Sequence, residues 1–403
     1  PTNWGNFFGG DCWEYDDLRG EYYLHLFAKE QPDLNYHNEA VIEAIEEAMH
    51  FWLERGVAGF RCDVINIIYK EAIKNGKWRP ALTGSEYYLS TPGCHRVLHR
   101  LHEDVLAKYD AFTVGETVFV TPKMADDLVN PTREELSTVF AFEHMETDCY
   151  KIKWFLRRFN PDCFFACLTK WQKALPWNTV YLENHDQPRS VSRFGNDTQY
   201  HDESAKALAT LVLTLRGTPF LYEGQEIGMT NFDFPDMQKV RDVESINIWN
   251  IGKRLHLPRS LRWRMIKTKS RDNARTPMQW NDSPNAGFTT GTPWLSVNGN
   301  YPRINVAEQE NAPNSVLAYY RQLIAFRNGS EILQAGDFSE LYRKDGVYAY
   351  RRSLNVESII VVISLSTKER PNPVSGTVVL SNYGRQESPA CLSPYEALIL
   401  REV

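Results

Sequence analysis

The sequence predicts an α/β protein: a main part built on a parallel sheet, followed by a small antiparallel β-domain. Between residues 39 and 223, amphipathic helical stretches alternate with short apolar stretches typical of strands, and five such pairs follow one another. That alternation is the pattern of parallel β/α units. After Gly329 the pattern changes to short β-branched, aliphatic or aromatic runs separated by turn residues, which indicates antiparallel strands.

The elements of the first part follow from apolar periodicity and from capping residues. Residues 39–55 carry an apolar stripe at helical spacing, and Thr121-Pro122 is a cap followed by proline in the first turn of a helix. We expect helices over residues 39–55, 92–109, 122–129, 163–174, 202–215 and 314–328. We expect parallel strands over residues 57–65, 111–117, 137–142, 178–184 and 219–223.

Changes in composition suggest the domain boundaries. Residues 1–37 are rich in Gly, Asp and aromatic residues and predict an irregular, loop-rich segment. Residues 38–329 would form the parallel domain, with an irregular insertion at about 229–311 where Pro, Gly, Asn and Trp are dense. Residues 330–403 would form a β-sandwich domain. Its strands are expected at 347–350, 358–364, 376–380 and 397–400.

The composition disfavours several classes of protein. The chain has 403 residues, enough for two or three domains, and 42% of them are hydrophobic and 24% charged, as in ordinary globular proteins. A net charge of −6 argues against a nucleic-acid partner. The longest apolar stretches, such as Ala207–Leu215, are shorter than the roughly 20 residues of a membrane span, so no membrane partner is expected.

Aromatic residues and cysteines add weaker indications. Aromatic residues make up 13% of the chain, and their flat faces suit sugars, although core packing explains most of them. The seven cysteines show no zinc-ligand spacing, and we interpret them as thiols in a reducing compartment. No signal-peptide pattern is visible at the start of the sequence. These features predict a cytoplasmic protein.

Three acidic residues stand at the carboxyl ends of predicted strands: Asp63, Glu116 and Asp186. In a β/α barrel the carboxyl ends of the strands form the active site, so we expect the three side chains to converge. Strand alternation puts Arg61 on the same face as Asp63, where its charge favours the ionised carboxylate. Glu116 ends an apolar strand, which suits a general acid.

Each of these residues also has an ordinary structural explanation. Asp63 could cap a helix, Glu116 could be a loop residue, and His185 beside Asp186 could be a satisfied polar group. Their recurrence at equivalent positions favours a site. Three carboxylates can gather Mg²⁺ or Ca²⁺, or one can attack an acetal carbon while another protonates the leaving oxygen. Arg61 among the acids argues against a metal, so neither a metal nor another cofactor is expected.

The motifs around these acids resemble the conserved regions of the α-amylase superfamily of glycoside hydrolases (family 13), in its oligo-1,6-glucosidase and α-glucosidase branch. Three segments of this chain resemble the second, third and fourth conserved regions of the superfamily. They are, in that order, Gly59-Phe60-Arg61-Cys62-Asp63, Val114-Gly115-Glu116-Thr117 and Glu183-Asn184-His185-Asp186. The branch is indicated further by Gln31-Pro32-Asp33-Leu34-Asn35 and by the segment 271–280. The resemblance covers almost the whole chain.

The resemblance implies a retaining glycosidase with a defined division of roles. Asp63 would be the nucleophile that forms a glucosyl ester, and Glu116 would be the general acid and then the base. Their carboxyls would lie about 5–5.5 Å apart. Asp186 would hold the hydroxyls of the sugar at the cleavage site. Arg61 and His185 would bind near the nucleophile and the sugar, and Arg275 would contact the non-reducing glucose.

Val64, which follows the nucleophile, bears on the linkage that is cleaved. A valine at that position resembles the enzymes of this branch that cleave α-1,6 bonds. Val64 could also be an ordinary β-branched strand residue. The implied activity is removal of glucose from the non-reducing ends of short oligosaccharides, through α-1,6 and possible α-1,4 bonds. A trehalose-6-phosphate hydrolase, a sucrose isomerase and a non-catalytic binding or assembly relative remain alternatives.

The implied fold is an eight-stranded (β/α)₈ TIM barrel, of which this chain shows about five carboxyl-terminal β/α units. Residues 1–37 would then be the end of the family's inserted loop domain. We therefore expect the chain to be the carboxyl-terminal part of a longer enzyme. Its partners would be a small oligosaccharide substrate and a missing N-terminal segment of the same enzyme.

Overall fold

The computed structural model describes residues 1–79, 82–150 and 152–402. The chain divides into two compact units, Pro1–Glu143 and His144–Val403, which are described separately below. Within the part of the chain that the structure describes, no helix is both long enough and apolar enough to cross a membrane.

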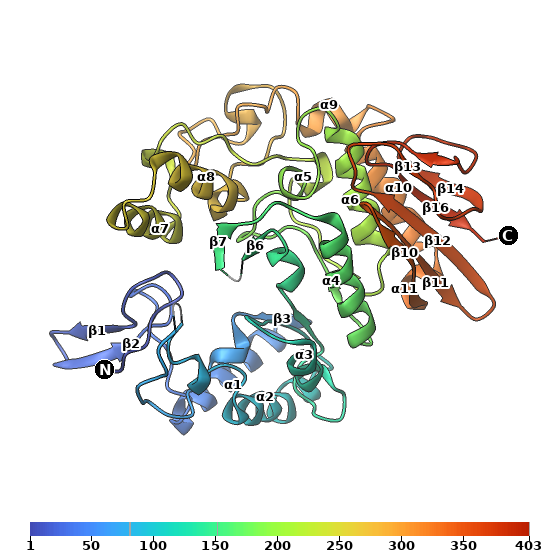
Figure 1. Cartoon of the computed structure of the whole chain (residues 1–403). Coiled ribbons are helices and arrows are strands. Elements are labelled where there is room, and N and C mark those ends of the chain that lie inside the picture. The colour runs from blue at the N-terminus through green and yellow to red at the C-terminus, as the bar shows by residue number, and fades with distance from the viewer. Residues whose placement is uncertain (80–81, 151, 403) are drawn as a thin grey trace. The chain divides into compact units, whose positions relative to one another are not determined.

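The first unit contains a three-stranded parallel sheet with helices between its strands (Figure 1). A hairpin of β1 (Trp13–Asp16) and β2 (Glu21–Leu24) comes first in the chain. The sheet then forms in the order β3-β4-β5, with every pair parallel. Its elements in chain order are α1 (Glu39–Leu53), β3 (Gly59–Cys62), α2 (Pro92–Asp104), β4 (Phe112–Glu116), α3 (Pro122–Val129) and β5 (Thr138–Phe140). Short 3₁₀ turns lie at Ile65–Ile67, Ser85–Tyr87, Leu106–Lys108 and Glu143–Glu146.

Capping residues explain where these helices start. Asn38 accepts a hydrogen bond from the backbone N–H of Ala40 and begins α1. Thr91 and Thr121 cap α2 and α3 in the same way, and each of these helices has proline in its first turn. Gly115 in β4 is required by packing, because a Cβ there would lie 2.7 Å from the side chain of Leu136. A larger residue at position 115 would therefore force Leu136 away from β4.

The second unit begins with β6 (Cys149–Tyr150) and β7 (Ile152–Leu156), an antiparallel pair. The remaining two predicted parallel strands form β8 (Thr179–Val180) and β9 (Thr218–Pro219), which pair in parallel. Its first helices are α4 (Pro161–Ala174), α5 (Ser190–Arg193) and α6 (His201–Thr214). Among the described residues the parallel strands therefore lie in two sheets, β3-β4-β5 and β8-β9, and no closed barrel sheet joins them.

Two regular helices occur within 229–311, a stretch that the sequence pattern suggested to be irregular. They are α7 (Val243–Arg254) and α8 (Arg259–Lys269). Helix α8 is rich in basic residues, but Met265 and Ile266 pack into an apolar cluster with Trp154, Phe234 and Val240. Tertiary packing thus stabilises a helix whose own periodicity is weak. The rest of the stretch consists of loops, short 3₁₀ turns and α9 (Val306–Glu310).

The carboxyl-terminal part is an antiparallel β-domain, as predicted. After α10 (Val316–Asn328) and α11 (Glu331–Ala335), a five-stranded sheet forms in the order β10-β11-β12-β16-β14 (Figure 1). Its strands are β10 (Asp337–Lys344), β11 (Val347–Leu354), β12 (Glu357–Ser364), β14 (Thr377–Ser381) and β16 (Ala397–Arg401). A second pair joins β13 (Arg370–Pro371) to β15 (Cys391–Leu392).

Two buried arginines, Arg327 on α10 and Arg352 on β11, hydrogen-bond the end of α6. Arg352 donates to the carbonyl oxygens of Thr214 and Gly336, each at 2.7 Å. Arg327 donates to those of Leu213 and Gly217, at 2.9 and 2.6 Å. The last carbonyls of a helix have no partner within the helix, so these guanidinium groups satisfy them.

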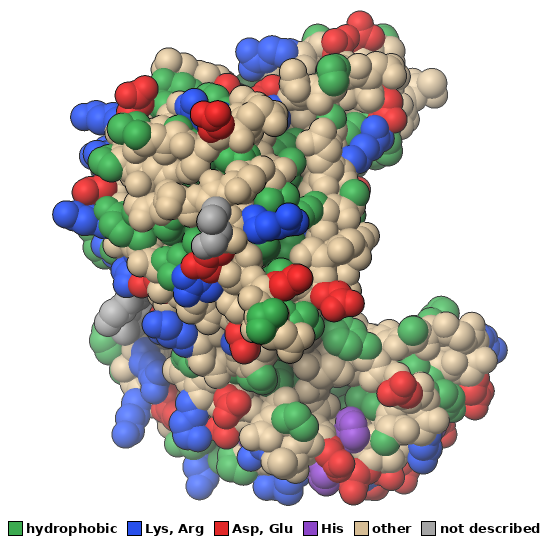
Figure 2. Space-filling model, turned by 90° about the vertical axis from the view of Figure 1, so that its right-hand side faces the viewer, with side chains coloured by type: hydrophobic (Ala, Val, Ile, Leu, Met, Phe, Trp, Pro, Cys, Tyr) green, Lys and Arg blue, Asp and Glu red, His purple; other side chains and the backbone are tan. Residues whose placement is uncertain are grey.

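The surface carries charges of both signs. On the face that Figure 2 shows, acidic and basic side chains are interspersed, with apolar side chains exposed between them. This mixture agrees with the small net charge of −6.

Candidate active site

Two of the predicted acids lie side by side in the first unit. Asp63 follows the last residue of β3, and Glu116 is the last residue of β4, the adjacent parallel strand. Arg61 lies between them: one guanidinium N–H donates to the Asp63 carboxylate, and another donates to Glu116 Oε2 at 2.5 Å. The two carboxylates are therefore within reach of a single side chain.

The two acids differ in their exposure to solvent. The side chain of Asp63 is 68% exposed, whereas that of Glu116 is 11% exposed. Burial lowers the pKa of the Arg61 guanidinium, but the hydrogen bonds to Asp63 and Glu116 and their charges outweigh it, so the pKa lies above its ordinary value. One accessible and one shielded carboxyl, bridged by a cation, can provide a nucleophile and a proton donor. The guanidinium lies between the acids, where a metal ion would need to lie.

Val64 has a backbone conformation that the sequence does not reveal. Its φ is 37° and its ψ 39°, in the left-handed region that β-branched residues rarely adopt. Such outliers concentrate at functional sites, where surrounding structure holds the strain. Here the strained residue turns the chain directly after Asp63.

Asn66 links the two segments that carry the acids, a role that the sequence analysis missed. Its amide donates to the carbonyl of Val118 at 2.9 Å, and its oxygen accepts from the N–H of Val118 at 3.0 Å. The side chain is fully buried and also donates to Ser90 Oγ. This two-way bond fixes the chain after β3 to the chain after β4. Only the pairing of β3 with β4 brings Asn66 near Val118, so no local motif could have identified it.

The third acid, Asp186, lies in the second unit after β8. Arg275 donates from Nη2 to Asp186 Oδ1 at 2.5 Å and from Nε to the carbonyl of His185 at 2.8 Å. His185 Nε2 lies 3.4 Å from Asp186 Oδ2. The structure thus brings His185, Asp186 and Arg275 together in one unit, and Arg61, Asp63, Val64 and Glu116 together in the other. The convergence of all three acids on one sugar stays a prediction.

A second layer of charges supports Asp186. Arg271 Nη1 lies 3.5 Å from Asp186 Oδ1, and Arg271 Nε donates to Asp242 at 2.8 Å. Asp242 is buried and caps α7 through the backbone N–H groups of Glu244 and Ser245. Burial raises the pKa of Asp242, but the charges of Arg271 and Lys153 and the hydrogen bonds from Ser245 and Arg271 together outweigh that effect and hold the pKa below its ordinary value. Asp242 was not singled out from the sequence, because its partner is 29 residues away.

Glu183 and Arg189 hold the loop that carries Asp186. Both side chains are buried, and they form an ion pair of 3.1 Å. Glu183 also accepts from the backbone N–H and the hydroxyl of Ser190, at 2.8 and 2.7 Å. Arg189 donates to the carbonyl of Glu223 at 2.6 Å, which ties this loop to the segment after β9.

This combination of parallel β/α units and a bridged carboxyl pair at adjacent strand ends defines a class: enzymes that cleave acetals with two acids. Residues 1–336 match the family model described as the catalytic domain of α-amylase. The chain belongs to the α-amylase family, glycoside hydrolase family 13, as the sequence motifs indicated.

Curated relatives agree with this assignment. The chain is 44% identical to an oligo-1,6-glucosidase of Parageobacillus thermoglucosidasius, with 100% of this chain and 75% of that protein covered. It is 38% identical to a trehalose-6-phosphate hydrolase of Bacillus subtilis, with 100% of this chain and 74% of that protein covered.

Solved structures agree as well. The trehalose-6-phosphate hydrolase of Bacillus licheniformis superposes with a TM-score of 0.90 at 39% identity, over 100% of this chain and 75% of that one. The isomaltulose synthase of Klebsiella sp. LX3 gives a TM-score of 0.92 at 34% identity, over the same shares.

Proposed function

We propose that this protein is a retaining exo-α-glucosidase that hydrolyses α-1,6 bonds at the non-reducing ends of short oligosaccharides. The observation that carries the proposal is the pair of carboxyls, Asp63 and Glu116, bridged by Arg61 at the ends of adjacent parallel strands. Relatives named oligo-1,6-glucosidase and glucan 1,6-alpha-glucosidase support the α-1,6 linkage, and Val64 is similar to that type.

In this mechanism each acid has one role in each of two steps. Asp63, exposed and paired with Arg61, attacks the anomeric carbon while Glu116 donates a proton to the leaving oxygen. Glu116 is the less exposed of the two carboxyls, with its side chain 11% exposed. Glu116 then takes a proton from water, whose oxygen displaces Asp63 and releases glucose.

We assign Asp186 to the hydroxyls of the sugar, with His185 and Arg275 as its neighbours in substrate binding. Arg275 and Arg271 hold one carboxylate oxygen of Asp186, so that the other faces His185. A carboxylate that is already held in place can accept hydrogen bonds from two sugar hydroxyls without a further loss of side-chain entropy.

The test is hydrolysis of isomaltose by the chain, together with any N-terminal segment that accompanies it in the sample, and by Glu116→Gln in the same preparation. Turnover should fall by about 10²–10⁴-fold in the variant, because the leaving oxygen loses its proton donor. Glu47→Gln on the exposed face of α1 is the matched control and should keep full turnover. Proton NMR of the first product should show α-glucose, as double displacement requires. Unchanged turnover in Glu116→Gln would refute its role as the general acid, and absence of turnover in the parent would favour a non-catalytic binding or assembly role.

A second candidate function within the family is supported by specific relatives. The trehalose-6-phosphate hydrolases and the isomaltulose synthase that match this chain favour hydrolysis of trehalose 6-phosphate or isomerisation of sucrose. A panel of isomaltose, panose, maltose, sucrose and trehalose 6-phosphate separates these activities. The highest kcat/KM on isomaltose supports our proposal, and the highest value on sucrose or trehalose 6-phosphate refutes it.

We further propose a cytoplasmic location and, as a partner, an N-terminal segment of the same enzyme. The curated relatives that match are longer than this chain, which covers about three quarters of each. The intact mass of the material under denaturing conditions tests the second point: an additional polypeptide supports it, and full activity of this chain by itself refutes it.

A further inference from the structure

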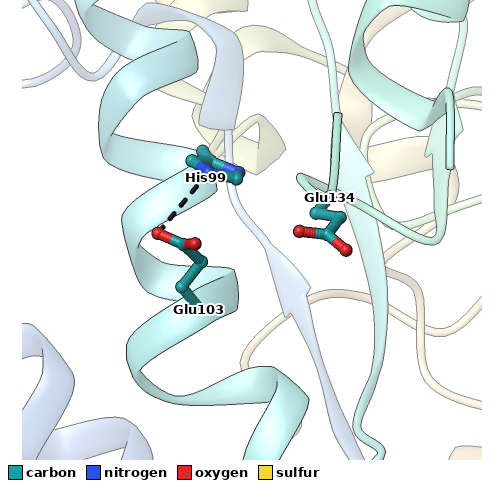
Figure 3. Close-up of side chains that lie close together, drawn as sticks. All are labelled: His99, Glu103 and Glu134. Carbon is teal, nitrogen blue, oxygen red and sulfur yellow. Dashed lines mark ion pairs between the residues drawn. The ribbon is translucent and has the colours of Figure 1, made fainter. Parts of the chain in front are cut away.

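A histidine and two glutamates gather on the surface of the first unit, outside the site described above. His99 and Glu103 lie one turn apart on α2, and Glu134 lies in the segment between α3 and β5 (Figure 3). His99 Nε2 is 3.5 Å from Glu103 Oε2. One ligand atom from each of the three residues lies within 4.8 Å of the other two.

The histidine has the orientation of a metal ligand. Its Nδ1 lies 2.9 Å from the carbonyl oxygen of Arg133, and a carbonyl can only accept, so Nδ1 carries the hydrogen. In the neutral ring Nε2 therefore presents its lone pair toward the carboxylate of Glu103. Two acceptors facing each other favour a cation between them. A backbone carbonyl that fixes the tautomer of a histidine is the usual support of a metal-binding imidazole.

The segment that carries Glu134 is fixed on both sides. The residue before it, Arg133, accepts from His99, and the residue after it, Glu135, is buried and bonds His95 Nδ1 at 2.7 Å. Arg133 Nε also donates to Glu135 at 2.9 Å. Glu134 thus keeps its place opposite α2. Of the three proposed ligands, only His99 lines the open hollow of about 570 Å³ on this surface, whose other charged or polar lining residues are His95, Arg96, Asp127, Arg133 and Glu135.

Charge and ligand type select the ion. Two carboxylates supply the charge that a divalent cation needs, and one imidazole nitrogen with two carboxylate oxygens suits Zn²⁺ better than Mg²⁺ or Ca²⁺. Ligand atoms around zinc lie roughly 3.3 Å apart, since its bonds are about 2.0–2.2 Å long. Glu103 and Glu134 are exposed, so rotation of their side chains can close the remaining distance.

We propose that His99, Glu103 and Glu134 form a zinc-class site that joins α2 to the segment before β5. Because β5 pairs with β4, the strand that ends in Glu116, the ion would brace the sheet that carries the candidate catalytic acids. The site does not depend on the proposed function, because none of its residues belongs to the carboxyl pair.

Calorimetric titration of the untagged chain with zinc chloride tests the proposal. It should use a Cys391→Ser background, because Cys391 is an exposed free cysteine and thiolates are zinc ligands. We expect one zinc to bind, and His99→Ala and Glu134→Gln each to weaken its affinity by about tenfold or more. Zinc should also raise the thermal midpoint of the parent but not of His99→Ala.

Two exposed residues provide matched controls. His256→Asn removes an exposed histidine, and asparagine tolerates the φ of 55° at that position. Glu43→Gln removes an exposed glutamate from α1. Both controls should keep the affinity of the parent. Equal zinc affinity in the parent, His99→Ala and Glu134→Gln would overturn the proposal and leave His99–Glu103 as an ordinary ion pair, as would absence of binding to the parent.

Discussion

Two carboxylates of this protein, Asp63 and Asp148, are held by arginine in different ways. Asp63 shares Arg61 with Glu116 and is 68% exposed. Asp148 is 7% exposed and pairs with Arg193 at 2.8 Å and with Lys269 at 2.6 Å. The first arrangement leaves a carboxylate open to a substrate, and the second encloses one completely.

The buried cluster has one cation too many for its single carboxylate. Burial raises the pKa of Asp148, but Arg193 and Lys269 outweigh it and lower the pKa to about 2. Burial and the charge of Arg193 lower the pKa of Lys269 to about 8, although Asp148 opposes them. The comparison shows that an arginine–carboxylate pair can take part in a reaction where the carboxylate is exposed. The same kind of pair stabilises the folded structure where all the charged groups are buried.

The largest effect is expected at the exposed carboxylate. Asp63→Asn removes the nucleophile and should lower isomaltose turnover by about 10⁴-fold. The thermal midpoint should change little, because the side chain is mostly solvated. Asp110→Asn, an exposed residue of the same unit, is the control and should keep its activity. Substantial turnover in Asp63→Asn would show that this exposed carboxylate is not the nucleophile.

Asp148→Asn should instead act on stability. It leaves Arg193 and Lys269 buried without their carboxylate, which costs about 3–5 kcal/mol in the free energy of unfolding. Urea denaturation of the second unit measures this loss, with the exposed Asp345→Asn as the reference. If the two variants unfold at the same urea concentration, the buried cluster contributes nothing to the free energy of unfolding.

Acid should weaken the buried cluster with a defined sign. The pKa of Asp148 is lower in the folded state, so between about pH 2 and 4 the unfolded chain binds more protons, and stability rises with pH. The contribution of about 2 kcal/mol is complete above pH 4 and is lost as the pH falls toward 2. Urea midpoints from pH 5 to pH 3 should therefore converge between the parent and Asp148→Asn. Parallel curves would contradict the lowered pKa.

The smallest effect concerns Asp186, whose 27% exposure lies between the two extremes. Asp242→Asn removes the charge that orients Arg271 toward Asp186, and we expect about a tenfold loss of kcat/KM on isomaltose. Ser245→Ala removes another partner of Asp242 but leaves its contact with Arg271, so it controls for damage to α7. Equal losses in both variants would mean that Asp242 acts only on the helix.

Local signals in the sequence identified several elements well. The strands expected at 57–65 and 111–117 contain β3 and β4, and the helices expected from 92 and 122 begin at Pro92 and Pro122. Apolar runs and threonine-proline caps act within one or two turns of chain, so no distant contact is needed to recognise them.

Other elements could not be recognised in this way. In strand β10, Asp337–Lys344, exposed residues alternate with half-buried ones, polar residues occur in both sets, and the pairing with β11 stabilises the strand. The pair β6–β7 and the helices α7 and α8 likewise depend on packing around Trp154, Phe234 and Ile266. Propensity is a weak guide where burial comes from segments far along the chain.

The sequence by itself determined the family, the residue types at the strand ends and the starts of the helices, because these are written in short, contiguous motifs. Only the tertiary structure decided that Arg61 bridges Asp63 and Glu116, that Asn66 ties both segments together and that Asp242 supports Arg271. Arg61 and Glu116 are 55 residues apart and meet only because β3 and β4 pair in parallel register. Such contacts form when strands align, and no local pattern encodes that alignment.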